Sequence, residues 1–296
     1  MREKPFSKYQ ILANVVMIIW TLIIVLPFLL LFMSSITEEN TLVSNGYSFL
    51  PAKFSIQSYA YIIKSGAKII KAYGVSIIVT VIGTIVNVAL SAMMAYPLAV
   101  KNLPGRRILM FFVFFTMLFN GGIVPSYIMW ANAFHIKDTL LAQIVPGFLV
   151  SAWNVMMMRT YFQTSIPDAL YEAAEIDGAT QFRIFRTIVI PLGKPILVTM
   201  GTFAGLTYWN DWTNGLYYIS KNKDLYNIQN LLNQMVQNIQ YLAQSSDSNV
   251  SSAAATLPAT GIQMAIAFVA ILPIMLIFPF FQKYYAKGIA VGAVKG

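Results

Sequence analysis

The sequence predicts an all-α membrane protein with six transmembrane helices. Of its 296 residues, 57% are hydrophobic and only 10% are charged, whereas a soluble domain carries about 25% charged residues. The apolar residues gather in separate runs, close to the roughly 20 residues that an α-helix needs to cross a bilayer core. The basic residues lie between these runs, so the net charge of +9 indicates orientation in a membrane and no nucleic-acid partner.

The first apolar run follows Arg2, Lys4 and Lys8, as the core of a signal peptide would. It has 23 residues and no small-residue cleavage site, so we expect an uncleaved span. The six predicted spans are 11–33, 72–100, 108–131, 140–162, 196–218 and 260–281.

Basic residues are unevenly divided between the two sides of these spans. With a cytoplasmic amino terminus, the inner segments hold 13 of the 20 basic residues and the longer outer segments hold seven. The positive-inside rule therefore predicts a multi-pass protein of the cell membrane with both termini cytoplasmic. The expected parts are an amino-terminal span and external segment (1–71), a transmembrane domain (72–281) and a cytoplasmic tail (282–296).

Sites for cofactors and metals are not expected in this chain. It has no cysteine, and the single His135 has no second histidine or cysteine beside which to bind a metal. A GxxxxGK[ST] phosphate loop is also missing from the sequence. We expect that the chain binds no cofactor and is not itself an enzyme.

The third span is interrupted at residues 120–125, which read NGGIVP. Glycine and proline both disfavour a continuous helix here, and a broken backbone at membrane depth has to face protein or water. Two interpretations remain open: a helix end followed by a re-entrant or surface turn, and a place on the path of a substrate.

Small or short polar residues recur four apart in two spans, which predicts faces for close helix packing. They are Gly83, Asn87, Ser91 and Ala95 in the second span, and Gly201 and Gly205 in the fifth.

The expected external loop, 219–259, contains apolar residues at helical spacing, which predicts an amphipathic helix. These residues are Leu225, Ile228, Leu232, Met235, Ile239 and Leu242. The following run, 245–256, is rich in serine and alanine, and it is either an exposed loop tip with a role of its own or a plain solvated linker.

The polar segment 165–195 between the fourth and fifth spans predicts two short helices joined by a turn. Ser165 and Pro167 suit the start of a helix over 167–177, and Gly178 suits its left-handed end. A second amphipathic piece runs toward Pro191, with Phe182, Phe185, Ile188 and Val189 expected on one side. We call this segment the elbow; a short helix with an acidic face and little core needs another protein surface on which to dock.

The elbow resembles the EAA loop of binding-protein-dependent ABC importer permeases. The likeness rests on EAAEIDGA at 172–179, Phe185, IVIP at 188–191 and Pro195. It implies that the first helix inserts into a groove of an ATPase subunit, where Glu172 contacts a basic residue, and that Gly178 permits the turn. The motif positions are Glu172, Ala173, Ala174, Asp177, Gly178 and Pro191. The competing interpretation is that Glu172 and Asp177 are ordinary solvated charges.

Further segments resemble the carbohydrate-uptake branch of these permeases, from Ala72 onward. They are FNGGIVPSY, WNDW at 209–212 and the ending GIAVGAVKG, and they are most similar to permeases for oligosaccharides or polysaccharide fragments, including alginate-type and pectin-type systems. The resemblance implies a type I ABC importer permease fold and a second homologous permease. It also implies two nucleotide-binding subunits that use ATP and Mg, and an extracytoplasmic sugar-binding protein that segment 225–256 reaches.

Aromatic and amide side chains mark a candidate path for a sugar, since rings pack on sugar C–H faces and amides or carboxylates bind hydroxyls. The candidates are Asn120 with Tyr127 and Trp130; Trp153 with Asn154; and Tyr208 with Trp209, Asn210, Asp211 and Trp212. Asp211 either faces a watery interior or lies at the water beside an interfacial aromatic belt.

The expected function is import of a sugar by alternating access, driven by the partner ATPase. Two other classes remain open on the sequence: an ion-coupled secondary transporter, because Asp211 lies within an apolar span, and a non-catalytic membrane scaffold. Substitution of Glu172 or Gly178 would leave uptake intact in the scaffold.

Overall fold

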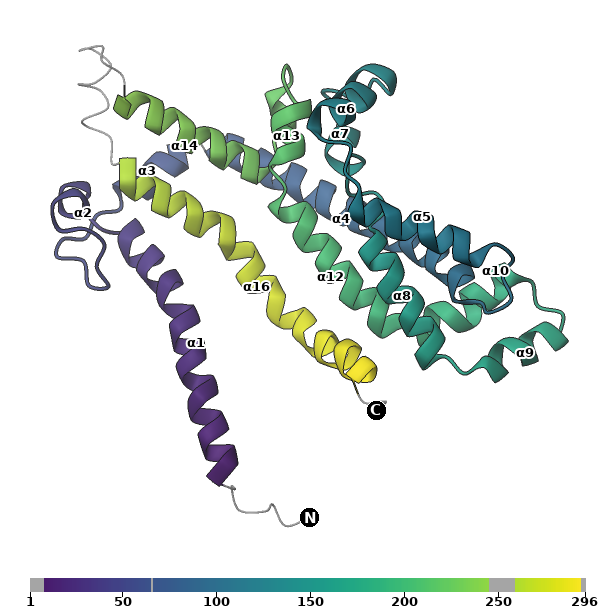
Figure 1. The fold of residues 1–296 in the computed structure, drawn as a ribbon. Helices are drawn as coiled ribbons and strands as arrows, with labels where there is room; N and C mark the ends of the chain where they lie inside the picture. The colour runs from purple at the N-terminus through teal and green to yellow at the C-terminus, as the bar shows by residue number, and fades with distance from the viewer. Residues whose placement is uncertain (1–7, 65, 245–258, 294–296) are drawn as a thin grey trace. The chain divides into compact units, whose positions relative to one another are not determined.

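The computed structural model describes residues 8–64, 66–244 and 259–293 (Figure 1). These residues form helices and turns, with one isolated antiparallel bridge between Thr37 and Phe54. The chain divides into two compact units, 1–69 with 232–273, and 70–231 with 274–296. The expected loop tip at 245–256 lies outside the described residues.

The first unit contains α1 (Lys8–Ser35), α2 (Glu39–Asn45), α3 (Gln57–Lys64) and the beginning of α16 (Ala259–Ala293). The carboxylate of Glu39 accepts hydrogen bonds from the N–H groups of Thr260 and Gly261, each at 2.8 Å. An anion at this position satisfies the free N–H groups and the positive end of a helix. Glu39 therefore fixes where α16 begins.

The second unit packs its helices around small residues. Its long elements are α4 (Gly66–Ala99), α5 (Arg106–Leu118), α8 (Ala152–Ser165) and α12 (Lys194–Asn210), and Figure 1 shows these four helices together. A Cβ atom on Gly83 would lie 2.5 Å from the ring of Tyr208 in α12, so only glycine admits that ring. Asn87, Ser91 and Ala95 are buried on the same face, which confirms the predicted packing face of the second span.

Shorter elements connect these helices. They are α6 (Ile123–Tyr127), the π-helix η1 (Ile128–Ala133), α7 (Leu141–Ile144), α9 (Asp168–Ile176), α10 (Gln181–Ile184), the π-helix η2 (Phe185–Val189), α11 (Ile190–Leu192), α13 (Thr213–Tyr218) and the 3-10 helix η3 (Lys223–Leu225). The amphipathic helix predicted in the loop 219–259 is α14 (Ile228–Gln244), while Leu225 belongs to η3.

By length and composition, the described helices supply three spans, or five if each bent pair counts as one span. The interruption predicted at 120–125 is confirmed, since α5 and the α6–η1 segment meet at an angle of 112°. The fifth region is bent by 79° between 181–192 and 194–210. At the carboxyl end, α16 continues to Ala293, beyond the expected end of the last span at 281.

Two spans predicted as continuous helices are interrupted, and those predictions were wrong. In the fourth, α7 ends at Ile144, Gly147 has a φ of 76°, and α8 starts after Ser151, whose Oγ accepts a hydrogen bond from the Asn154 N–H. In the fifth, α12 ends at Asn210 and α13 starts at Thr213. Polar caps start new helices at both places, and helical hydropathy alone does not reveal them.

Candidate functional site

The first helix of the elbow, α9, begins and ends as local chemistry requires. Pro167 precedes it in an extended conformation, and Asp168 stands in its first turn. At its end, the N–H groups of Asp177, Gly178 and Ala179 donate to carbonyls of the last turn, and Gly178 has a φ of 73°. Glycine tolerates this left-handed conformation without strain. The predicted helix and its turn are confirmed, except that Ser165 ends α8 and does not cap α9.

The inner side of the elbow is held against the end of α4. The Tyr96 hydroxyl donates a 2.5 Å hydrogen bond to Gln181 Oε1, and Gln181 Nε2 donates to Glu175 Oε1 at 3.0 Å. The ring of Tyr96 lies 5.5 Å from Phe185 and 6.3 Å from Tyr171. Tyr96 therefore connects both helical pieces of the elbow to a long helix.

Tyr171 is the one aromatic residue of α9, and it is half-buried. Burial, followed by the nearby Tyr96 and Asp168, raises the pKa of Tyr171 to about 12, so its hydroxyl stays neutral. Lys101 forms an ion pair with Asp168 at the start of α9. Because both of these charged side chains are largely exposed, the pair contributes little stability, but it places the basic loop after α4 beside α9.

The outer side of α9 carries both an acid and apolar side chains. Glu172 and Ala173 are exposed, together with Leu170 and Ile176, the latter 86% exposed. Among the described residues, no ion pair involves Glu172. Exposed apolar side chains grouped around a charge are typical of an interaction surface. The other motif residues are distributed differently: Ala174 packs inward, Asp177 and Gly178 form the turn, and Pro191 is exposed in α11.

The second piece of the elbow is partly π-helical, which changes its buried side. Ile184 and Val189 are buried at 1% and 0% exposure, whereas Phe182 is 68% exposed. Residues five apart share a side in a π-helix, as Ile184 and Val189 do. The prediction that Phe182 shares the apolar side with Val189 was therefore wrong, because it assumed an α-helical period.

Gly193 forms the joint between the elbow and α12, and the sequence analysis did not single it out. An added Cβ would lie 2.6 Å from the carbonyl oxygen of Val189 and 2.7 Å from the ring of Phe162. The chain can bend by 79° here because residue 193 has no side chain. Its position between Pro191 and Pro195 is the sequence signal by which it could have been found.

A cavity of about 380 Å³ collects part of the predicted sugar path. Trp153, Asn154 and Tyr208 line it, together with Asn87 and Thr207. The Asn154 amide donates to Asn87 Oδ1 at 2.8 Å, and the Asn87 amide donates to the Phe148 carbonyl at 2.6 Å. Asn87, expected only as a packing residue, thus belongs to a buried amide pair on the wall of this cavity.

Asp211 lies inside the protein, at 7% exposure. Its Oδ1 accepts hydrogen bonds from the Thr213 N–H and hydroxyl at 3.0 and 2.6 Å, which starts α13. The residues beside Asp211 differ in exposure: Trp209 is buried, whereas Asn210 and Trp212 are exposed.

Two buried asparagines join this break to the start of α14, and a third joins it to the segment before α8. Asn227 Nδ2 donates to the Asp211 carbonyl at 2.7 Å, and Asn230 Nδ2 donates to the Trp212 carbonyl at 2.5 Å. Asn214 Nδ2 donates to the Pro146 carbonyl at 3.0 Å. Sequence reasoning missed these asparagines because their partners are distant in the chain.

The remaining candidates lie around the break after α5. Asn120 is exposed and its Oδ1 accepts a hydrogen bond from the Gly122 N–H at 2.9 Å, which shapes the turn. Tyr127 stacks on Tyr218 with ring centres 5.7 Å apart, and its hydroxyl accepts a hydrogen bond from Lys137 at 2.7 Å. Trp130 packs in the same cluster. None of these residues lines the cavity beside Asn154.

A bundle of apolar helices with an exposed elbow anchored to it is the architecture expected of a membrane permease subunit. Residues 87–291 match the family model of the binding-protein-dependent transport system inner membrane component, and the chain belongs to this family. This confirms the predicted family of ABC transporter permeases, which are multi-pass proteins of the cell membrane.

Known relatives extend over almost the whole chain. The polygalacturonan/rhamnogalacturonan transport system permease protein YtcP of Bacillus subtilis (strain 168) is 37% identical over 280 residues, which are 95% of this chain and 96% of the relative. The arabinooligosaccharides transport system permease protein AraQ of the same organism is 28% identical over 309 residues, covering 100% of both chains. A crystal structure of a bacterial ABC transporter involved in the import of the acidic polysaccharide alginate matches with a TM-score of 0.77 and 25% identity, covering 96% of this chain and 100% of that one.

Proposed function

We propose that this chain is one permease subunit of an ATP-driven importer for oligosaccharides derived from a polysaccharide. It crosses the membrane six times with both termini in the cytoplasm, and it pairs with a second, homologous permease. Two nucleotide-binding subunits hydrolyse ATP with Mg, and an extracytoplasmic binding protein delivers the sugar near the segment 225–256. The names of the relatives support the substrate class, since they concern polygalacturonan, rhamnogalacturonan, arabino-oligosaccharides and alginate.

The two-sided elbow is the observation that carries this proposal. Its inner side is anchored to Tyr96, while Glu172, Leu170 and Ile176 on its outer side are exposed. A surface of this kind suits the groove of an ATPase subunit, and the anchored side transmits the motion of that subunit to α4 and, through Gly193, to α12. The two permease subunits would enclose a cavity for the sugar between them. Alternating access follows if the transmitted motion changes which side of the membrane this cavity faces.

The proposed path for the sugar includes Asn120, Tyr127, Asn154, Trp209, Asn210, Asp211 and Trp212. The cavity beside Asn154 combines amides with the exposed ring of Trp153, a combination that suits sugar hydroxyls and C–H faces. Asn210 and Trp212 are exposed and available to a ligand, whereas Asp211 already holds the start of α13.

Reconstituted uptake tests the function directly. Proteoliposomes are prepared with this chain, the second permease and the ATPase subunits. The binding protein is added outside, together with labelled oligogalacturonides, alginate oligosaccharides or arabino-oligosaccharides. We expect uptake of one of these sugars only when ATP and the binding protein are both present. Uptake that continues without the ATPase subunits, driven by an ion gradient, would show a secondary transporter instead.

Single-cysteine labelling tests the proposed topology, because the chain has no cysteine of its own. Asn102 and Asn222 are exposed on either side of the expected membrane. We expect Asn102→Cys to react with an impermeant maleimide only after the membrane is opened, and Asn222→Cys to react in intact cells. The reverse pattern contradicts a cytoplasmic amino terminus.

A further inference from the structure

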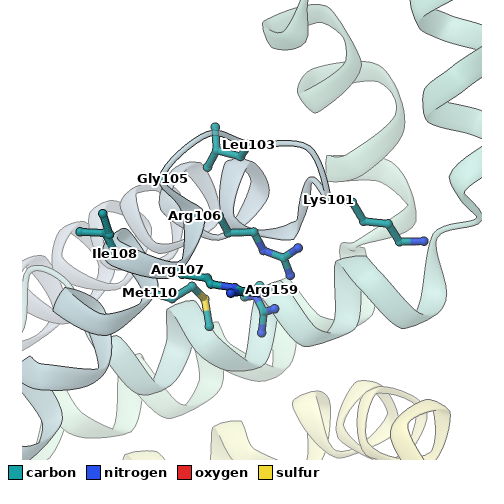
Figure 2. A pocket seen from close by; sticks show the side chains of 8 residues that line it. All are labelled: Lys101, Leu103, Gly105, Arg106, Arg107, Ile108, Met110 and Arg159. Atoms are coloured by element: carbon teal, nitrogen blue, oxygen red, sulfur yellow. The ribbon is translucent and has the colours of Figure 1, made fainter.

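A cavity of about 780 Å³ lies where the start of α5 meets α8, away from the sugar path and from the outer face of α9. Four of its lining residues are cationic: Lys101, Arg106, Arg107 and Arg159. Figure 2 shows the arginine side chains together, contributed by two helices that are about fifty residues apart in the sequence. The packing of α5 against α8 therefore creates a concentration of positive charge.

This charge is not balanced within the part of the chain that the structure describes. Of the four cations, only Lys101 has an acidic partner there, Asp168. Arg159 donates from Nε to the Leu98 carbonyl at 3.1 Å, which fixes its position without neutralising it. The first turn of α5 also contains no acidic residue. Three guanidinium groups around one cavity repel each other, and an anion between them relieves the repulsion.

Apolar side chains adjoin the cations. Ile108 and Met110 line the cavity itself, and Ile108 continues into Phe111 and Phe112 on an exposed face of α5. A free anion would contact only the charged side chains of such a surface. A ligand with an anionic head and hydrocarbon tails uses both parts, and basic pockets on the cytoplasmic side of transmembrane helices suit the phosphate of an anionic lipid.

We propose that this cavity binds the phosphate headgroup of an anionic phospholipid such as phosphatidylglycerol or cardiolipin. Arg106, Arg107 and Arg159 bind the phosphate, and the acyl chains lie along the apolar face of α5. The proposal rests on the proposed function only in placing residues 101–107 at the cytoplasmic face. Because Lys101 also pairs with Asp168 of α9, the bound lipid lies next to the elbow.

Binding of a fluorescent phosphatidylglycerol to the purified full-length transporter in phosphatidylcholine nanodiscs tests the site, with no nucleotide or sugar present. Arg106→Gln/Arg107→Gln is expected to weaken binding about thirtyfold, since each cation near an anionic lipid contributes a factor of roughly five. The matched control is Arg183→Gln/Arg186→Gln, which removes two exposed arginines of the elbow and is expected to bind as the unmodified protein does. Size-exclusion chromatography of each variant establishes that it is folded.

Three results overturn the proposal: equal binding by the Arg106→Gln/Arg107→Gln protein, equal weakening by the control, or displacement of the lipid by inorganic phosphate at low millimolar concentration. Displacement would identify a site for soluble anions. Since this measurement needs no transport, a protein that binds the lipid but imports no sugar would contradict only the proposed function.

Discussion

Replacing Glu172 by lysine is expected to reduce ATP-driven uptake about thirtyfold or more, while the chain still folds and inserts. Glu172 is exposed and has no ion-pair partner among the described residues, so its replacement removes nothing from the folded chain. In the docked complex, the positively charged lysine at position 172 would be buried against the basic residue of the ATPase subunit that we expect Glu172 to contact. Loss of one partner of a buried charge pair costs about 2–5 kcal/mol, and a factor of ten corresponds to about 1.4 kcal/mol.

The measurement compares sugar uptake and co-purification of the ATPase subunits. Glu175→Gln is the matched control, because Glu175 lies on the same helix but accepts a hydrogen bond from Gln181 within the elbow. We expect this control to keep most of its uptake. Normal uptake and normal co-purification by the Glu172→Lys protein would remove the elbow from the mechanism and favour a scaffold.

Gly193→Ala is expected to be strongly destabilising. The new methyl group would meet the backbone oxygen of Val189 at 2.6 Å and the ring of Phe162 at 2.7 Å. Neither group can move easily, since one belongs to a helical backbone and the other is a fully buried ring. Overpacking of this kind costs about 1–3 kcal/mol, and the strain falls on the joint between the elbow and α12.

Gly201→Ala provides the comparison, because its methyl group would lie 3.6 Å from a methyl of Val88, an ordinary contact. Thermal unfolding in detergent, followed by tryptophan fluorescence, should show a lower midpoint for Gly193→Ala and almost no change for Gly201→Ala. Similar midpoints for the two variants would mean that the close approach at Gly193 does not constrain the joint.

The sequence predicted those features of the fold that depend on neighbouring residues. The helix before Gly178 and the interruption at 120–125 were predicted because glycine, proline and capping residues act locally. The breaks after Ile144 and Asn210 were missed, since hydropathy was averaged over each whole span and the new helices depend on single polar caps. A hydropathy pattern measures whether a segment prefers lipid, and it does not measure whether one helix continues.

For the candidate sites too, the sequence indicated single residues but not the distant residues that the fold places beside them. Asn154 was selected together with its neighbour Trp153, but its partner Asn87 is far away in the sequence and the two asparagines meet only through the packing of α4 and α8. Arg106, Arg107 and Arg159 were counted only as inner basic residues. Their common cavity depends on the contact of α5 with α8, which no local pattern encodes.

The orientation of the elbow depends on the number of residues in the π-helical stretch Phe185–Val189. This stretch holds one more residue in its turn than an α-helix does, so Ile184 and Val189 face the core together. If a homologous chain lost one residue here, an ordinary α-helix would form. The part of the elbow before this stretch, including α9, would then rotate by about a quarter turn relative to α12. Glu172 would then point in a different direction although the motif letters were unchanged, so an insertion or deletion in this stretch deserves as much weight in sequence comparison as a substitution in the motif.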